Sequence, residues 1–305
     1  MDAKDIKKDI LPDSNQTEKE INRRQLAEGV RPDILNYDDI IKIAPFLKGH
    51  HKLVDKILHW LILDQCNAVH SKYCYTTGNE FSTLLIDDCY KIKKKLDNPE
   101  VLDKMKGQPF VTVSNHPYGA IDGILLIDII GRKFPDFKVM VNMFLNYISA
   151  MRPSFIAVDP SGSQDKEKQL ATMHGIRESI AHVRAGHPIG FFPAGAVSKI
   201  DKTLHISDRE WQPSIIRLIK QLKVPVIPVY FHGHNSAIFN ILGMINWRLR
   251  LPRLPRELFN KAGKEIRISF GEPISPAEQA DFKNLDEFGR MLRERTYGLK
   301  EIYKD

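Results

Sequence analysis

Cysteine is scarce in this sequence, and long apolar runs are missing from it. Its 305 residues include three cysteines, Cys66, Cys74 and Cys89, and no Cys-x-x-Cys pair. That small, odd number argues against a disulfide framework and a thiolate zinc site and fits a reducing compartment. No run of about eighteen apolar residues occurs, so we expect no membrane-spanning helix, and residues 1–39 lack the apolar core of a signal peptide. The protein would therefore meet a membrane only at its surface.

Acidic residues are outnumbered by basic ones, 38 to 45, which gives a formal net charge of +7 and a pI of about 9.1. A basic balance favours an anionic partner, such as a membrane surface, a nucleotide-bearing cofactor, an acidic protein or nucleic acid. A basic protein without such a partner explains it equally well. The sequence contains no recognisable nucleic-acid-binding motif, so nucleic acid is not expected. Residues 247–256 alternate cations with apolar side chains and are a candidate contact with anionic headgroups, with a plain surface loop as the alternative.

The chain divides into four segments by composition and pattern. Residues 1–38 form a polar arm, and residues 39–105 are expected to be mainly helical. Residues 106–275 alternate strand and helix signals and form the main domain. Residues 276–305 predict a closing helix that begins with a proline in its first turn.

Helical patterns in the first third of the chain differ in their apolar faces. Residues 17–28 of the polar arm are expected to be partly helical. Residues 51–69 place apolar side chains at helical spacing around a wide face, which predicts a helix packed on the core rather than one lying at a membrane interface. Residues 81–95 predict another amphipathic helix, and the three lysines that end it form a solvated terminus.

Six short apolar runs predict strands, and they lie at residues 110–113, 139–141, 155–158, 189–192, 226–231 and 266–270. Helical patterns separate them, most clearly over 167–184 and 214–221. Strands that alternate with helices indicate an α/β fold with a mostly parallel central sheet flanked by helices. The helical residues 39–105 would then be an N-terminal extension of that fold.

The most informative stretch is residues 111–123, VTVSNHPYGAIDG. Its β-branched opening predicts the end of a buried strand, and Pro117 has no N–H to continue the ladder. Gly119 lets the backbone bend before an apolar run that predicts a buried helix. His116 therefore follows a strand end and Asp122 opens the next helix, where α/β sheets place their chemistry. A carboxylate beside an imidazole suits general-base catalysis; the alternative is an ordinary surface hydrogen bond.

Three more segments follow in order along the chain. Residues 155–159 read FIAVD, and residues 189–198, IGFFPAGAVS, lead a strand into a small turn where backbone N–H groups can approach a bound group. Residues 224–229, VPVIPV, are a strand bracketed by prolines. Together with Asn115-His116 and Asp122, these segments resemble the ordered blocks of the glycerolipid acyltransferase family, typified by the lysophosphatidic acid acyltransferases. The resemblance covers the chain from residue 105 to residue 275.

That resemblance implies a peripheral enzyme at the cytoplasmic face of the inner membrane. It would move a fatty acyl group from a thioester of coenzyme A or acyl carrier protein to the hydroxyl of a lysolipid, with no cofactor and no metal beyond that co-substrate. His116 would be the general base, Asp122 would orient and charge it, and backbone N–H groups near Gly195 would hold the oxyanion. The residues expected to bind substrate are Asn115, Gly119, Phe192, Pro193, Ala194, Gly195 and Lys199.

The chain departs from the family pattern at three places. His116 and Asp122 are separated by five residues instead of four, so the residues between them must include a loop that absorbs the extra one. Pro160 stands where the family often has Arg. Ala194 and Val197 stand where the family has Glu and Arg.

These departures bear on the acceptor, because Arg pairs with phosphate oxygens through two parallel hydrogen bonds. Without those cations we expect an acceptor that lacks a terminal phosphate, such as an N-acylated amino acid whose hydroxy-fatty chain carries the free hydroxyl. The alternative is that Lys199 or Arg152 replaces the missing Arg. Two other functions stay open: a non-catalytic lipid- or acyl-carrier-binding protein with a decayed site, and a metal-dependent hydrolase built on His232 and His234.

Overall fold

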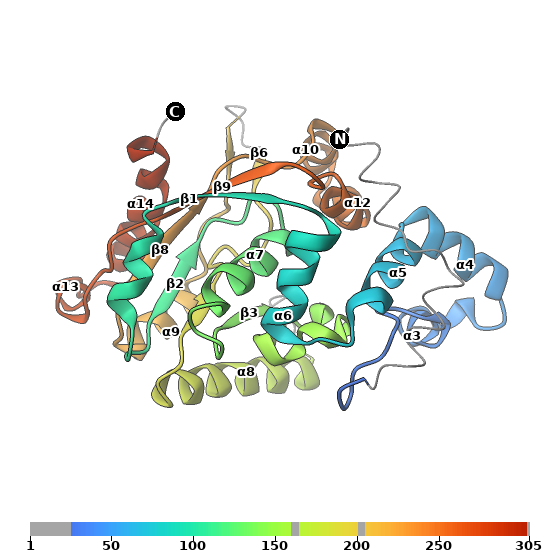
Figure 1. The fold of residues 1–305 in the computed structure, drawn as a ribbon, viewed down its shortest axis with the longest axis horizontal. Coiled ribbons are helices and arrows are strands. Elements are labelled where there is room, and N and C mark those ends of the chain that lie inside the picture. The colour runs from blue at the N-terminus through green and yellow to red at the C-terminus, as the bar shows by residue number, and fades with distance from the viewer. Residues whose placement is uncertain (1–25, 160–164, 201–204, 304–305) are drawn as a thin grey trace.

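The computed structural model describes residues 26–159, 165–200 and 205–303. These residues contain a seven-stranded sheet in the order β1-β9-β8-β2-β5-β3-β4 (Figure 1). Every neighbouring pair is parallel except β8 and β9. The strands are β1 (Lys93–Asp97), β2 (Val111–Ser114), β3 (Lys138–Asn142), β4 (Phe155–Val158), β5 (Ile189–Phe191), β8 (Val226–Phe231) and β9 (Glu265–Phe270). The prediction of a mostly parallel α/β sheet is confirmed, and each of the six predicted strands forms within one residue of its expected ends.

The central strands are buried on both faces. All four residues of β2 and all six of β8 are buried, which explains why their sequences are nearly continuous apolar runs. Successive side chains of a strand point to opposite faces. Accordingly, Val139 and Val141 of β3 join one apolar cluster while Met140 joins the other. The sheet therefore separates two cores.

Helices cover both faces of the sheet and make a three-layer fold (Figure 1). On one face, α6 (Gly78–Thr83) and α7 (Ala120–Gly131) contribute to the first cluster. On the other, α8 (Lys166–Arg184), α9 (Pro213–Leu222) and α14 (Leu285–Ile302) contribute to the second. Residues 121–131 of α7 are all buried, as expected for a helix that is apolar on every side. This burial fixes the start of α7, which carries Asp122.

The remaining described elements surround this layered core. A two-stranded hairpin pairs β6 (Lys199–Ile200) with β7 (Ile206–Ser207). The other helices are α3 (Tyr37–Ile43), α4 (His51–Trp60), α5 (Leu63–Tyr73), α10 (Ala237–Ile245), α11 (Trp247–Arg250), α12 (Leu254–Phe259) and α13 (Pro276–Ala280). Short 3-10 or π segments are η1 (Pro45–Leu47), η2 (Leu84–Cys89), η3 (Pro99–Met105), η4 (Met143–Tyr147), η5 (Ser149–Ser154) and η6 (Leu251–Arg253).

The predicted helix over 51–69 is broken in two. Ile62 adopts a left-handed conformation with φ of 54°, so α4 ends at Trp60 and α5 starts again at Leu63. Val54 is the buried residue of α4, whereas Leu53 is 47% exposed and Trp60 is 70% exposed. The prediction that this helix packs on the core is therefore wrong for α4, because its apolar spacing does not find a matching surface.

The predicted helix over 81–95 is wrong in its second half. Helix α6 ends at Thr83, the π segment η2 ends at Cys89, and the lysine run enters β1 at the sheet edge. Lys94 is paired there with Asp87 at 2.7 Å and with the buried Asp128 at 2.6 Å. Lysine-rich edge strands resist pairing with other chains. A charged strand of this kind carries no apolar alternation, which is why the sequence pattern missed it.

The closing helix of the sequence prediction forms as two helices. Pro276 lies in the first turn of α13 and Ser275 caps it, as the proline signal indicated. The chain then turns, and Asn284 caps the separate helix α14. Most of the helix predicted over 17–28 lies outside the described residues.

Candidate active site

The carboxyl end of β2 carries the central pair of the site. The strand ends at Ser114, and the amide side chain of Asn115 bonds to both backbone groups of Phe231 at the end of β8, accepting at 2.7 Å and donating at 2.9 Å. Asn115 is 3% exposed. Its amide therefore bridges the ends of the neighbouring strands β2 and β8 and does not face a substrate. This bridge fixes the point at which His116 leaves the sheet.

A short loop returns the chain from His116 to Asp122. Asp122 lies in the first turn of α7, and its Oδ2 accepts hydrogen bonds from the N–H groups of Tyr118 and Gly119, each at 3.0 Å. Gly119 has φ of 93°, and a Cβ there would lie 3.2 Å from the Val197 side chain. The loop thus absorbs the extra residue of the His-x5-Asp spacing, as expected.

The loop brings the imidazole and the carboxylate together. Nδ1 of His116 lies 2.9 Å from Oδ2 of Asp122, whose side chain is fully buried, while the histidine side chain is 18% exposed. Burial raises the pKa of Asp122, and the neighbouring imidazole and two backbone N–H groups oppose that rise. The ring of Phe192 packs against that of His116, with centroids 4.3 Å apart and the two planes tilted by 33°. One face of the imidazole is therefore held, and its exposed part can meet a hydroxyl.

The turn after β5 does not offer the Gly195 N–H to a ligand. That N–H donates to the carbonyl of Phe192 at 2.9 Å, so it is not free to hold an oxyanion. For the other backbone N–H groups near Gly195, the oxyanion role stays a prediction. Gly195 has φ of 63°, and a Cβ would lie 2.0 Å from the Gln212 amide, so the turn requires glycine. Pro193 and Ala194 are buried beneath the site, and Ala194 belongs to the second core cluster. Phe192 is the residue of this group that contacts His116.

Asp208 links the loop after β2, which carries His116, to the loop after β5, which carries Ser198. No sequence pattern singled out Asp208. Its carboxylate accepts from the His116 N–H at 3.1 Å and from the Ser198 hydroxyl at 2.6 Å. The Ser198 N–H in turn donates to the His116 carbonyl at 2.8 Å. From α14, the Tyr297 hydroxyl accepts from the Asp208 N–H and Arg293 donates to its carbonyl. No motif surrounds Asp208, and the partners of its carboxylate range from Trp211, three residues away, to His116, 92 residues away.

Arg250 is a second residue that the sequence did not single out for this site. It is 3% exposed, and its two terminal nitrogens donate to the carbonyls of Val197 and Ser198, each at 2.7 Å. A guanidinium therefore lies beside the backbone of Val197, the residue that stands where the family has Arg. The expectation that this region lacks its cation is corrected, since Arg250 reaches it from α11.

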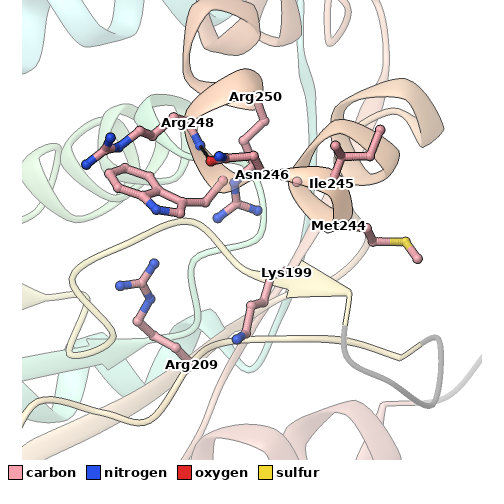
Figure 2. Close-up of a pocket in the computed structure, with 9 residues that line it drawn as sticks. Lys199, Arg209, Met244, Ile245, Asn246, Arg248 and Arg250 are labelled. Atoms are coloured by element: carbon pink, nitrogen blue, oxygen red, sulfur yellow. Dashed lines mark hydrogen bonds between the residues drawn. The ribbon is translucent and has the colours of Figure 1, made fainter.

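Lys199 lines a cavity of about 410 Å³ beside these loops (Figure 2). Arg209, Arg248 and Arg250 line the same cavity, so the alternative in which Lys199 replaces a missing cation has structural support. Arg152 does not line it and donates to the carbonyls of Asn146 and Gly29. Pro160 lies outside the described residues.

The His-x-His pair does not converge on one point. The Nε2 of His232 lies 2.7 Å from the Ser269 hydroxyl, whereas the Nδ1 of His234 bonds to the adjacent carbonyl of Asn235 at 2.7 Å. In the part of the chain that the structure describes, no three His, Cys, Asp or Glu side chains lie close enough to share a metal ion.

Comparisons with known proteins point to one family. The family profile described as Acyltransferase matches residues 44–304. The chain is 28% identical over 189 residues to the lyso-glycine lipid O-acyltransferase of Bacteroides thetaiotaomicron, covering 57% of this chain and 66% of that protein. It is 26% identical over 186 residues to the protein of the same name from Phocaeicola vulgatus, covering 56% and 64%. Each alignment thus spans just under two thirds of the relative's length.

The 1-acyl-sn-glycerophosphate acyltransferase of Thermotoga maritima is one of the solved structures to which the chain is similar. It matches with a TM-score of 0.48 and 15% identity, over 83% of this chain and 90% of that one.

Proposed function

The chain belongs to the acyltransferase family, and on that premise we propose that it transfers a fatty acyl group from an acyl thioester to the hydroxyl of a lysolipid. The observation that carries this proposal is the pair His116–Asp122, with its nitrogen and oxygen 2.9 Å apart at the open end of β2. A non-catalytic binding protein has no need of an imidazole held against a buried carboxylate. If the protein is a non-catalytic binding protein, no acylated product should form in an activity assay.

In the proposed reaction His116 acts as general base. It takes the proton of the acceptor hydroxyl while the hydroxyl oxygen forms a bond to the thioester carbonyl carbon. Asp122 stabilises the imidazolium that results. When the tetrahedral intermediate collapses, the carbon–sulfur bond breaks and the imidazolium returns the proton to the departing thiolate. The products are an ester and the free thiol of coenzyme A or acyl carrier protein.

For the acceptor we propose a phosphate-free lyso-aminolipid. The loss of arginine at Val197 no longer supports this choice, because Arg250 supplies a guanidinium beside the backbone of that residue. Support comes instead from the two relatives, both named for O-acylation of a lyso-glycine lipid. The donor is a thioester of either coenzyme A or acyl carrier protein.

A side-by-side assay tests this function. The full chain is incubated with labelled acyl-CoA or acyl-carrier protein and with either lyso-glycine lipid or lysophosphatidate, and products are identified by mass spectrometry. We expect an O-acylated glycine lipid, formed with a higher kcat/KM than any product from lysophosphatidate. A higher kcat/KM with lysophosphatidate would refute the acceptor. No product from any pair would favour the non-catalytic alternative.

We also propose that the protein works at a membrane surface, on the cytoplasmic face of the inner membrane. Four apolar side chains of α10 are more than half exposed: Ile238, Ile241, Met244 and Ile245. They share one side of the helix, while Phe239 is buried on the other. An exposed apolar stripe beside basic residues is typical of interfacial helices. None of the described helices combines the length and apolarity needed to cross a bilayer.

Vesicle sedimentation checks this attachment. We expect binding to vesicles with anionic lipid at low salt and weaker binding at high salt, because exposed charges are screened within about 8 Å at physiological ionic strength. The double variant Ile241→Ser/Ile245→Ser should bind at least tenfold more weakly, since fully burying even one such side chain contributes about 1.5–3 kcal/mol. Leu170→Ser, at a residue of α8 that is 64% exposed, is the matched control. Binding that is absent at low salt or unchanged in molar salt would contradict the proposal.

A further inference from the structure

The cavity beside Lys199 gathers positive charge from three separate segments. Lys199 comes from β6, Arg209 from the chain after β7, and Arg248 and Arg250 from α11. Figure 2 shows Lys199 and Arg209 on one side of the space and Arg248 and Arg250 on the other. The described residues that line it include no Asp or Glu. Its volume of about 410 Å³ lies within the range of small-molecule sites.

Arg250 carries the least compensated of these charges. It is 3% exposed, its terminal nitrogens bond to neutral carbonyls, and its Nε is buried with no partner among the described residues. Burial and the nearby Arg209 lower the pKa of its guanidinium. A buried charge without an opposite charge is costly. A bound anion in the cavity would offset that cost.

The cavity adjoins the catalytic pair through the backbone. Ser198 and Asp208 are the residues whose hydrogen bonds hold the backbone of His116. Lys199 and Arg209 are the next residues after each of them. An anion bound by these two cations is therefore held by the same two segments that hold the backbone of His116.

Part of the cavity lining is apolar and continues onto the surface. Met244, Ile245 and Trp247 form it, and they belong to the exposed apolar side chains of α10 and its continuation. A cationic recess that opens onto an apolar helix face matches an amphiphile with a charged head and a hydrocarbon chain. A water-soluble anion would leave these apolar side chains unused.

We propose that this cavity binds the anionic head group, a carboxylate or a phosphate, of the acceptor lysolipid. The inference rests on the proposed function and names the residues that select its acceptor. Lys199 and Arg209 bind the head directly, because both side chains are exposed and neither forms an ion pair with another residue that the structure describes. Arg250 lines the cavity and adds a further positive charge, although its side chain is buried.

Kinetics with the double variant Lys199→Gln/Arg209→Gln test the proposal. We expect KM for the acceptor to rise about tenfold or more, since hydrogen bonds to charged groups are the strong ones, while kcat and KM for the donor stay within twofold. The matched control is Arg290→Gln/Lys264→Gln, which removes the same two charge types from exposed positions outside the cavity. A rise in KM for the donor instead would assign the cavity to the phosphates of the donor. No change in either KM would overturn the proposal.

A binding measurement without turnover separates this inference from the proposed function. Titration calorimetry with the His116→Ala variant compares lyso-glycine lipid, its uncharged methyl ester and lysophosphatidate, each below its micelle concentration. We expect both acids to bind at least tenfold more tightly than the ester, and we expect Lys199→Gln/Arg209→Gln to remove that difference. If the acids bind more tightly than the ester but no acyl transfer is found, the proposed head-group site stands and the proposed acyltransfer is refuted. Equal affinity for acid and ester would refute the cavity even when transfer is observed.

Discussion

Replacement of His116 by alanine is expected to lower acyl transfer by about 10²- to 10⁴-fold, the usual contribution of a general base. The imidazole lies 2.9 Å from Asp122 and is the partly exposed member of the pair. Its backbone bonds to Asp208 and Ser198 do not involve the ring, so the loop should keep its place. The loss should therefore appear in the rate and not in the fold.

Initial rates and thermal unfolding of the purified variant measure both effects. His182→Ala is the control, because His182 is a partly buried histidine of α8 that bonds to the Pro188 carbonyl, away from the pair. It should keep full activity. If His116→Ala retains more than half the rate with any accepted donor, the base is another group.

Asp122→Asn is expected to lower the rate by about 10- to 10³-fold, a smaller loss than that of His116→Ala. An asparagine oxygen can still accept from the N–H groups of Tyr118 and Gly119, so the loop keeps its hydrogen bonds. What disappears is the negative charge next to the imidazole. An opposite charge at this range favours the ionised form of its partner by a factor of about 10 to 10³, which sets the size of the loss.

A second buried aspartate of the same helix supplies the control for this variant. Asp128 is fully buried in α7 and pairs with Lys94 and Arg132. Asp128→Asn should lower the unfolding temperature, since it leaves two cations without a buried partner, but the folded enzyme should keep its rate. An undiminished rate in folded Asp122→Asn would remove that carboxylate from the reaction.

The parts of the site that the sequence predicted are local. His116 and Asp122 lie within seven residues, and a strand signal, a proline and a glycine fix the chain between them. The loop geometry could therefore be inferred without knowing what surrounds it. The strands were predicted for the same reason, since a strand buried on both faces is marked by its own apolar residues.

The parts that the sequence missed depend on distant residues. Asp208 reaches back 92 positions to His116, and Arg250 reaches back 52 to Ser198. Val197 suggested a lost cation because a motif is compared position by position, whereas a charge in space can come from any neighbouring element. The exposed helix α4 makes a similar point: helical spacing of apolar residues predicts a face, but it does not say whether protein covers that face.

The bonds between Asp208 and α14 have a consequence for the order in which the site can be assembled during synthesis. His116 and Asp122 can meet as soon as α7 has folded. Asp208, whose carboxylate anchors their loop, has its own backbone held by Arg293 and Tyr297, residues that a ribosome adds more than 170 positions after Asp122. A nascent chain therefore carries the reactive pair long before its geometry is locked. Activity in a growing polypeptide should remain suppressed until α14 has left the exit tunnel and docked.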